Sequence, residues 1–460
     1  MSGSTSVATP ASIFTAAFAL RLALFHLPAL ASTLADQVEI STPITSFKRL
    51  SEGVFLFRNG VPPYDGGVFH QVCAKGHARA DRAFSGAKTD RLFNLLLSKA
   101  PLLLGLFYPI LSSPLLVNLL YILGDLAIGY MLLQITAIKD QDSAHAKKIR
   151  QYGGQLESPG MDGVTVAALY LFNPFTIASC LGRSTILYSN LAVVAGIWMG
   201  MKRNQNLAMF NIALATYLSL YPAMLTIPVW LMLNREAGGY SVQKKTAAQS
   251  ASVFLLSLGS LFLLSFVLVD SWDFFVSVYG TILTVSDLTP NLGLFWYFFI
   301  EMFDQFRPFF LVVFQIHVFT FAIPISIKLR KYPLFVSFLL CTIMGSFKGY
   351  PSVGDASLYL GLLPLSSEIF KYMRYSFLIV NLFLYSSLLA PIFWYLWVYV
   401  GSGNANFFYA IGLVYGIGEI ILMIDTTFAV SRRDFELLSP VEEVSADGTK
   451  PDWDRKVIQK

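Results

Sequence analysis

The sequence predicts an all-α integral membrane protein that crosses the bilayer many times. The chain is 55% hydrophobic and only 13% charged, with a mean hydropathy of +0.59, whereas soluble domains are about 25% charged. Apolar runs of about 20 residues recur along it, and each is long enough to span roughly 30 Å of hydrocarbon. The clearest are 7–32, 114–138, 250–269, 308–327, 375–399 and 407–430.

Shorter apolar runs fill the middle of the chain and are interrupted by proline, glycine or a charge. Counting them gives about twelve spans in all. The first run is followed by ADQVEIST, which is no cleavage signal, so we expect a retained first helix. Pro174 predicts a kink after Asn173. The expected helices are 8–32, 113–137, 163–182, 184–201, 205–219, 221–234, 250–270, 308–327, 332–347, 352–367, 374–399 and 406–430.

The basic residues predict the topology. They form short clusters between apolar runs, and the segmentation puts six of these clusters on one side of the membrane, as the positive-inside rule requires of the cytosolic side. Both termini are then cytosolic. We expect one membrane domain over 1–430, with luminal loops at 35–109 and 270–307, and a flexible cytosolic tail over 431–460. The net charge of +5 is scattered rather than gathered into a stripe, so no nucleic-acid partner is expected.

The second luminal loop combines carboxylates with aromatic rings. Asp287, Asn291, Trp296 and Glu301 lie within SDLTPNLGLFWYFFIEMFDQF. Aromatic faces stack on sugar rings, and carboxylates bind ammonium or hydroxyl groups. These residues are therefore candidates for binding a glycolipid headgroup. The alternative is an ordinary interfacial aromatic belt with solvated acids.

Two further luminal turns carry candidate residues. In FKGYPSVGD, Lys348 could bind a lipid phosphate, or it could pair with Asp355 at a helix end; Tyr350 lies between them. In GSGNANFFYA, the amides of Asn404 and Asn406 could bind sugar hydroxyls, and Phe407 would lie where acyl chains begin. An Asn/Gly turn beside an interfacial aromatic pair is the alternative.

The chain resembles the PIG-U family, the polytopic subunits of the GPI transamidase complex. The resemblance runs in order from about Glu39 to Arg433, through ISTPITSFKRLSEG, PPYDGGVFHQ, YLFNPFTIASCLGRST, ATYLSLYPAMLTIP, SDLTPNLGLFWYFFIEMFDQF, FKGYPSVGDASLYLGLLPL and GSGNANFFYAIGL.

This resemblance implies a complex of the endoplasmic-reticulum membrane that attaches a preassembled GPI glycolipid to the C-termini of precursor proteins. It implies that the chemistry belongs to a separate, caspase-like subunit, while this chain recognises or presents the lipid. It also implies an architecture similar to the multi-spanning, GT-C-like glycosyltransferases that use lipid-linked sugars. No cofactor, metal or catalytic residue is expected on this chain.

Three other interpretations stay open at this point. A catalytic thiol would have to be Cys73, with His70 as its base, because Cys180 and Cys341 fall in apolar runs. A lumen-facing mannosyltransferase dependent on dolichol-phosphate sugars would use Asp36 and Glu39, just after the first span. A transporter would be indicated by ionisable residues within spans, which are Arg21, Asp125, Glu419 and Asp425.

Overall fold

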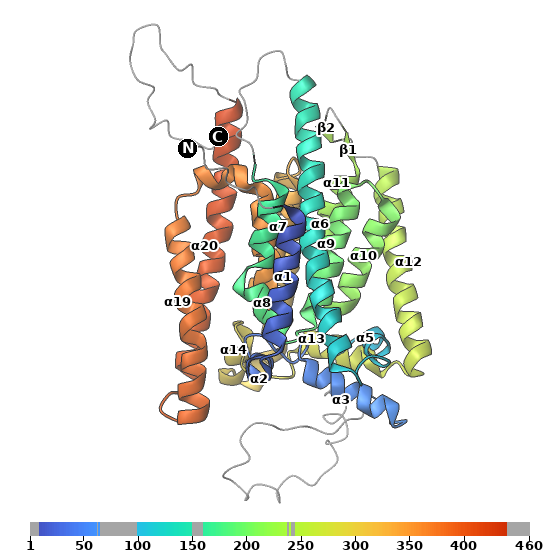
Figure 1. Ribbon diagram of the computed structural model, residues 1–460, viewed down its shortest axis with the longest axis vertical. Coiled ribbons are helices and arrows are strands. Elements are labelled where there is room, and N and C mark those ends of the chain that lie inside the picture. Colours follow the sequence, from blue (N-terminus) through green and yellow to red (C-terminus); the bar gives the residue numbers. More distant parts are fainter. Residues whose placement is uncertain are drawn as a thin grey trace, which may run out of the picture.

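The protein is a bundle of helices, most of which run along its longest axis (Figure 1). The only strands in the described part of the chain are β1 (Arg235–Glu236) and β2 (Gly239–Tyr240), a two-residue antiparallel hairpin. The all-α fold class is therefore confirmed. The computed structural model describes residues 9–61, 63–64, 99–149, 160–236, 239–240 and 244–438.

The helices follow the apolar runs closely. Those of the first half are α1 (Pro10–Phe25), α2 (Pro28–Asp36), α3 (Phe47–Arg58), α5 (Pro101–Phe107), α6 (Pro114–Ile149), α7 (Gly163–Leu171), α8 (Pro174–Leu181), α9 (Ile186–Met201), α10 (Gln205–Ser219), η1 (Tyr221–Leu225), α11 (Thr226–Leu233) and α12 (Lys244–Val269). Those of the second half are η2 (Phe275–Gly280), α13 (Thr281–Thr284), α14 (Phe295–Glu301), η3 (Asp304–Phe306), α15 (Arg307–Thr320), α16 (Ala322–Lys328), α17 (Pro333–Phe347), α18 (Val353–Leu362), η4 (Leu363–Tyr372), α19 (Ser376–Tyr395), η5 (Leu396–Val400) and α20 (Ala405–Leu438).

Five helices of the described chain are long and apolar enough to cross a bilayer, or seven spans if each of two bent pairs counts as one. The predicted first span is broken: α1 and α2 meet at 88°, because Pro28 begins α2 and cannot continue the preceding helix. The predicted kink after Asn173 is confirmed, since α7 and α8 meet at 51°. Every predicted span coincides with one helix or consecutive helices, but the count of about twelve membrane crossings stays a prediction.

The bundle has two ends, which we call the terminal face and the opposite face. At the terminal face α1 begins and α20 ends; at the opposite face lie α2, α3 and α14 (Figure 1). The predicted luminal loops both contribute to the opposite face. Helix α20 continues to Leu438, past the predicted end of the membrane domain at residue 430. The rest of the predicted tail lies outside the described residues, and the division into domain and tail stays a prediction.

A buried ion pair joins α1 to α6 inside the bundle. The Arg21 side chain donates to Asp125 with Nε 2.6 Å from Oδ2, and both side chains are fully buried. Arg21 also donates to the carbonyl oxygen of Leu171, at the end of α7, and the Tyr170 hydroxyl donates to the other oxygen of Asp125 over 2.8 Å. Three helices are thus held by one network, in which the charges are paired and hydrogen-bonded as hydrocarbon requires.

Close helix packing also depends on small residues. Gly196 of α9 faces Ile212 of α10, and a Cβ at residue 196 would lie 2.6 Å from the Ile212 side chain. Glycine here lets the two helices approach, the usual device of membrane bundles. Helix α12 differs, because Leu256 and Val267 are 74% and 76% exposed. Such apolar exposure is expected of a helix that faces lipid.

We expect Asp125→Leu to destabilise the protein by about 3–5 kcal/mol, because it leaves the Arg21 charge buried without a partner. The double variant Arg21→Met with Asp125→Leu removes both charges and should recover most of this loss. Heating detergent-solubilised membranes and measuring the remaining folded protein by fluorescence-detected size-exclusion chromatography tests both. Leu256→Ala, on the exposed face of α12, is the control. A double variant no more stable than the single one would contradict the pairing.

Candidate functional site

Four segments distant in sequence converge at the opposite face: 37–49, 285–301, 349–355 and 404–412. Val38 packs in one apolar cluster with Trp296 of α14 and Phe408 of α20. The backbone N–H of Val353 donates to the Glu39 carbonyl oxygen over 2.8 Å. Most of the predicted site residues lie in these four segments, so the fold brings the three predicted luminal stretches together.

Aromatic rings from α14, α19, η5 and α20 form what we call the aromatic cluster, made of Trp296, Tyr297, Trp394, Trp397, Phe408 and Tyr409. Trp296 is 1% exposed and stacks on Trp397 with ring centroids 6.3 Å apart. Its indole N–H has no hydrogen-bond acceptor among the described residues. Tyr297 stacks on Tyr409 at 4.5 Å. Trp296, a predicted glycan contact, is therefore a buried core residue, and its ring is not exposed for stacking on a sugar.

The exposed rim of the aromatic cluster carries the polar candidates. The Tyr297 hydroxyl donates to the side-chain oxygen of Asn406. Asn404 accepts the backbone N–H of Phe407 over 3.3 Å and so caps the start of α20. Phe407 itself is 53% exposed, and Glu301 at the end of α14 is also exposed. Amides, a carboxylate and a half-exposed aromatic ring, which also contacts Phe393, thus lie along one accessible edge.

Asp287 belongs to a second group, a partly buried ion pair beside this rim. Its Oδ2 accepts the Arg49 guanidinium over 2.6 Å, and its backbone N–H donates to the Tyr350 hydroxyl over 3.1 Å. Although desolvation opposes ionisation, the Arg49 charge and the Thr289 hydroxyl lower the pKa of Asp287. Tyr350 is 1% exposed. Asp287 is therefore ionised, and Arg49 compensates its charge.

Asn291 shapes the backbone of the same loop. Its side-chain oxygen accepts the N–H of Gly293 over 2.8 Å, and its amide donates to the Thr289 carbonyl oxygen. A Cβ on Gly293 would lie 2.6 Å from the Pro351 ring, so only glycine allows this close contact between the 285–301 loop and the 349–355 turn. Asn291 is buried, which gives it a structural role.

Lys348 and Asp355 form the ion pair that the sequence offered as the alternative to phosphate binding. Their side chains meet at 2.6 Å and are 2% and 11% exposed. Asp355 also accepts the backbone N–H of Ser352 and caps α18. A cavity of about 10 Å³ adjoins the pair, next to Asn190 and Tyr221, and its size suits a single water molecule. The pair closes the α17–α18 turn.

The two acids weighed for a glycosyltransferase lie in different environments. Asp36 is half-exposed and pairs with Lys48 on α3. Glu39 is buried, and neither carboxylate oxygen has a hydrogen-bond partner among the described residues. Desolvation raises the pKa of Glu39 to about 7. In the described part of the chain, no group of three or more His, Cys, Asp or Glu side chains could hold a metal ion.

The intramembrane acids weighed for transport have structural partners. Asp125 pairs with Arg21, as described above. Glu419 accepts the Tyr359 hydroxyl over 3.0 Å. Asp425 accepts the backbone N–H groups of Arg374 and Tyr375, over 2.9 Å and 3.0 Å, so it caps the start of α19. These contacts lie in different parts of the bundle and explain each acid without an ion pathway.

Both described cysteines, Cys180 and Cys341, are free and buried. The conceivable dyad of Cys73 and His70 lies outside the described residues.

Sequence reasoning missed Arg49 and Lys99, which organise the opposite face. The Lys99 ammonium donates to the Ile44 carbonyl oxygen over 2.6 Å and to the Thr185 hydroxyl over 2.8 Å. Complete burial, and then the Arg49 charge, lowers the pKa of Lys99 well below its usual value. Arg49 lies in α3 and Lys99 just before α5, both within the predicted first luminal loop, where solvated cations are ordinary. Because their partners are distant in sequence, no local pattern identifies them.

Known proteins resemble the chain along nearly its whole length. The family model described as "GPI transamidase subunit PIG-U" matches residues 15–74 and 94–415. The GPI-anchor transamidase component PIGU of Homo sapiens is 35% identical over 456 residues, which cover 95% of this chain and 97% of the relative. The GPI transamidase component GAB1 of Saccharomyces cerevisiae is 36% identical over 423 residues, 91% and 93% of the two chains. The GAB1 homolog of Schizosaccharomyces pombe is 30% identical over 418 residues, 90% and 91%.

Glu39 should make stability depend on pH. Because its pKa rises from 4.5 to about 7 on folding, the folded state binds the extra proton, and stability falls as pH rises from about 5 through 7. Glu39→Gln keeps the shape without the charge and should flatten this dependence. Melting temperatures of the detergent-solubilised protein at pH 5, 6, 7 and 8 provide the measurement, with Asp36→Asn as the exposed control. An unchanged pH profile in Glu39→Gln would show that Glu39 is not the titrating group.

Proposed function

The chain belongs to the PIG-U family of GPI transamidase subunits, and from this premise we propose that it holds the GPI glycolipid while another subunit performs the covalent step. It is accordingly a membrane component of the GPI transamidase complex. Its partners would be the other subunits, including a caspase-like catalytic chain. Its location would be the endoplasmic-reticulum membrane, where precursor proteins receive the anchor.

The accessible edge beside the aromatic cluster is the observation that carries this proposal. A GPI lipid is amphiphilic, so its binding site needs hydrogen-bonding groups for sugars next to apolar surface for acyl chains. Asn406 and Glu301 supply the first, and the exposed Phe407 supplies the second. Both kinds of group stand at one end of the bundle, where a lipid headgroup would meet the membrane surface. We therefore place the glycan at Asn404, Asn406 and Glu301.

The remaining predicted site residues fix the position of this edge and do not form part of its exposed surface. Trp296 and Asn291 are buried and fix α14 and its preceding loop. Asp287 and Tyr350 link that loop to Arg49 and to the 349–355 turn. Lys348 and Asp355 close the turn itself. In this proposal these residues position the binding edge, and the exposed rim contacts the ligand.

The opposite face would be luminal and both termini cytosolic. Basic side chains near the ends of long helices support this orientation: Lys139 lies in the second half of α6, and Arg432 and Arg433 lie near the end of α20. Both helices end at the terminal face (Figure 1). Cationic residues beside spans favour the cytosolic side. The glycan-binding edge would then face the lumen.

Neither of the two described cysteines lies in the candidate site. A transamidase of the cysteine type needs an accessible thiolate with a nearby base. The thiols of Cys180 and Cys341 are buried within α8 and α17, and Cys73 lies outside the described residues. Our assignment of the covalent step to a caspase-like chain rests on the family resemblance.

Removing the Asn406 amide should impair GPI attachment without disturbing assembly. We expect Asn406→Leu to lower surface display of a GPI-anchored reporter about three- to tenfold, the loss corresponding to one or two hydrogen bonds. Flow cytometry measures display, and co-purification of the other subunits measures assembly. Asn381→Leu, an exposed position on α19, is the matched control. Loss of assembly together with display would indicate a scaffold role instead.

A second candidate function, the mannosyltransferase, draws support from Glu39, a buried carboxyl whose pKa of about 7 suits a general base. The ion pair of Asp36 with Lys48 speaks against it. We expect cells carrying Asp36→Ala with Glu39→Ala to make fully mannosylated GPI lipid. Mass spectrometry of their GPI precursors tests this, and an under-mannosylated precursor would favour the transferase.

A further inference from the structure

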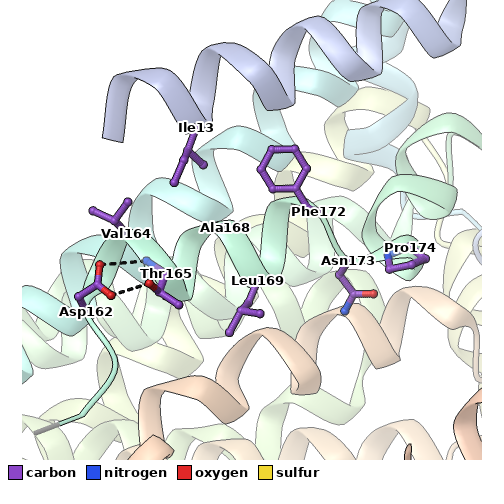
Figure 2. Close-up of a pocket in the computed structure, with 9 residues that line it drawn as sticks. All are labelled: Ile13, Asp162, Val164, Thr165, Ala168, Leu169, Phe172, Asn173 and Pro174. Atoms are coloured by element: carbon purple, nitrogen blue, oxygen red, sulfur yellow. Dashed lines mark hydrogen bonds between the residues drawn. The ribbon is translucent and has the colours of Figure 1, made fainter. Parts of the chain in front are cut away.

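A groove of about 780 Å³ opens between α1 and the bent pair α7 and α8 (Figure 2). Ile13 of α1 points toward α7, and Phe172 points back toward α1. Most of its lining is apolar; the polar members are Asp162 and Thr165 near one end and Asn173 near the other. The lining residues are Ile13, Asp162, Val164, Thr165, Ala168, Leu169, Phe172, Asn173 and Pro174.

The length of the groove matches one leaflet of a bilayer. It follows α7 (Gly163–Leu171), which at 1.5 Å per residue measures roughly 14 Å, about half of a 30 Å hydrocarbon layer. It stops at the 51° bend between α7 and α8. Asn173 fixes the bend, because its side-chain oxygen accepts the N–H of Phe175 over 2.9 Å. The groove therefore runs from the terminal face to mid-membrane.

These features favour an acyl chain as the occupant of the groove, rather than water or a helix of a partner protein. Water needs two or more polar partners, but the Asp162 carboxylate is engaged by the backbone N–H and hydroxyl of Thr165, and the Asn173 oxygen is engaged at the bend. A partner's spanning helix would need a contact surface along the full bilayer, whereas this groove covers half of it. A single-leaflet lipid chain has the matching length.

The rim favours a headgroup that carries an ammonium group. Asp162 is exposed there, and the Thr165 hydroxyl lowers its pKa, so the carboxylate is charged. Nearby, Lys139 is held by Glu368 over 2.8 Å, so its charge is compensated. Glu368 lies close to Gly160, two residues before Asp162. The polar group described at this rim is thus a carboxylate, which attracts an ammonium group.

We propose that this groove holds one acyl chain of a phospholipid with an ammonium headgroup, from the leaflet at the terminal face. The site is separate from the candidate glycolipid edge, which lies at the other end of the bundle. It would keep α1 and α7 apart in a fixed geometry. The inference does not rest on the proposed function.

The intact complex in nanodiscs tests this with a photoactivatable phosphatidylcholine whose diazirine lies on one acyl chain. We expect labelling of the peptide that spans residues 160–175. Ala168→Trp fills the groove and should reduce this labelling about tenfold. This is the loss of affinity expected when roughly two methylene groups of the acyl chain are no longer buried in the groove. Leu256→Trp, on the exposed face of α12, should leave it unchanged. A phosphatidylglycerol probe should label the peptide less than the choline lipid.

Equal labelling in Ala168→Trp and the unchanged protein would overturn the proposal, as would equal labelling by the two lipids. A second variant covers the case in which Ala168→Trp fails to fold. Leu169→p-benzoylphenylalanine places a photocrosslinker in the groove at a position that is 47% exposed. An adduct with the mass of phosphatidylcholine would support the proposal. An adduct with another subunit would show that a protein segment occupies the groove, and would overturn it.

Discussion

A bilayer gives helices little reason to associate, because lipid chains are as apolar as leucine side chains, so specific polar contacts and close packing must hold the bundle. The Arg21–Asp125 pair is such a contact, and both of its side chains are fully buried. With Tyr170 and the Leu171 carbonyl oxygen it fixes α1, α6 and α7 in one place. Because α1 leads directly into α2 and the 37–49 segment, this network also sets where that segment meets α14 and α20. The candidate edge therefore depends on a contact buried in hydrocarbon.

The opposite face repeats the same principle with further polar contacts. Arg49–Asp287 and Lys348–Asp355 each close a loop that would otherwise be free, and the fully buried Lys99 ties the residues before α5 to the 37–49 segment and α9. Aromatic stacking then joins α14 to η5 and α20. The outcome is a rigid support with few polar groups left outside. Those that remain, at Asn406 and Glu301, are exposed beside Tyr297, where a ligand could reach them.

Hydropathy predicted the helices well, since α6, α12, α19 and α20 are long and continuous, and Pro174 correctly indicated the bend. It did not predict the 88° break before Pro28, because a proline near the end of an apolar run leaves the hydropathy unchanged. For the site, sequence reasoning selected segments that the fold brings together. It did not distinguish the buried residues that hold these segments in place from the exposed residues that could contact a ligand. Trp296 and Asn291 look like surface groups in sequence, yet both are buried. Arg49 was not selected, because its partner Asp287 lies 238 positions away and only the fold joins them.

The central claim is that this chain holds the GPI lipid at the edge formed by α14 and the start of α20. The most direct measurement is the amount of GPI that co-purifies in mild detergent with the complex when its catalytic subunit is inactive, quantified by mass spectrometry. The account predicts that GPI is retained by the unchanged chain and lost when Asn404, Asn406 and Glu301 are all replaced by leucine, with the complex still assembled. Equal retention of GPI by the triple variant would contradict it.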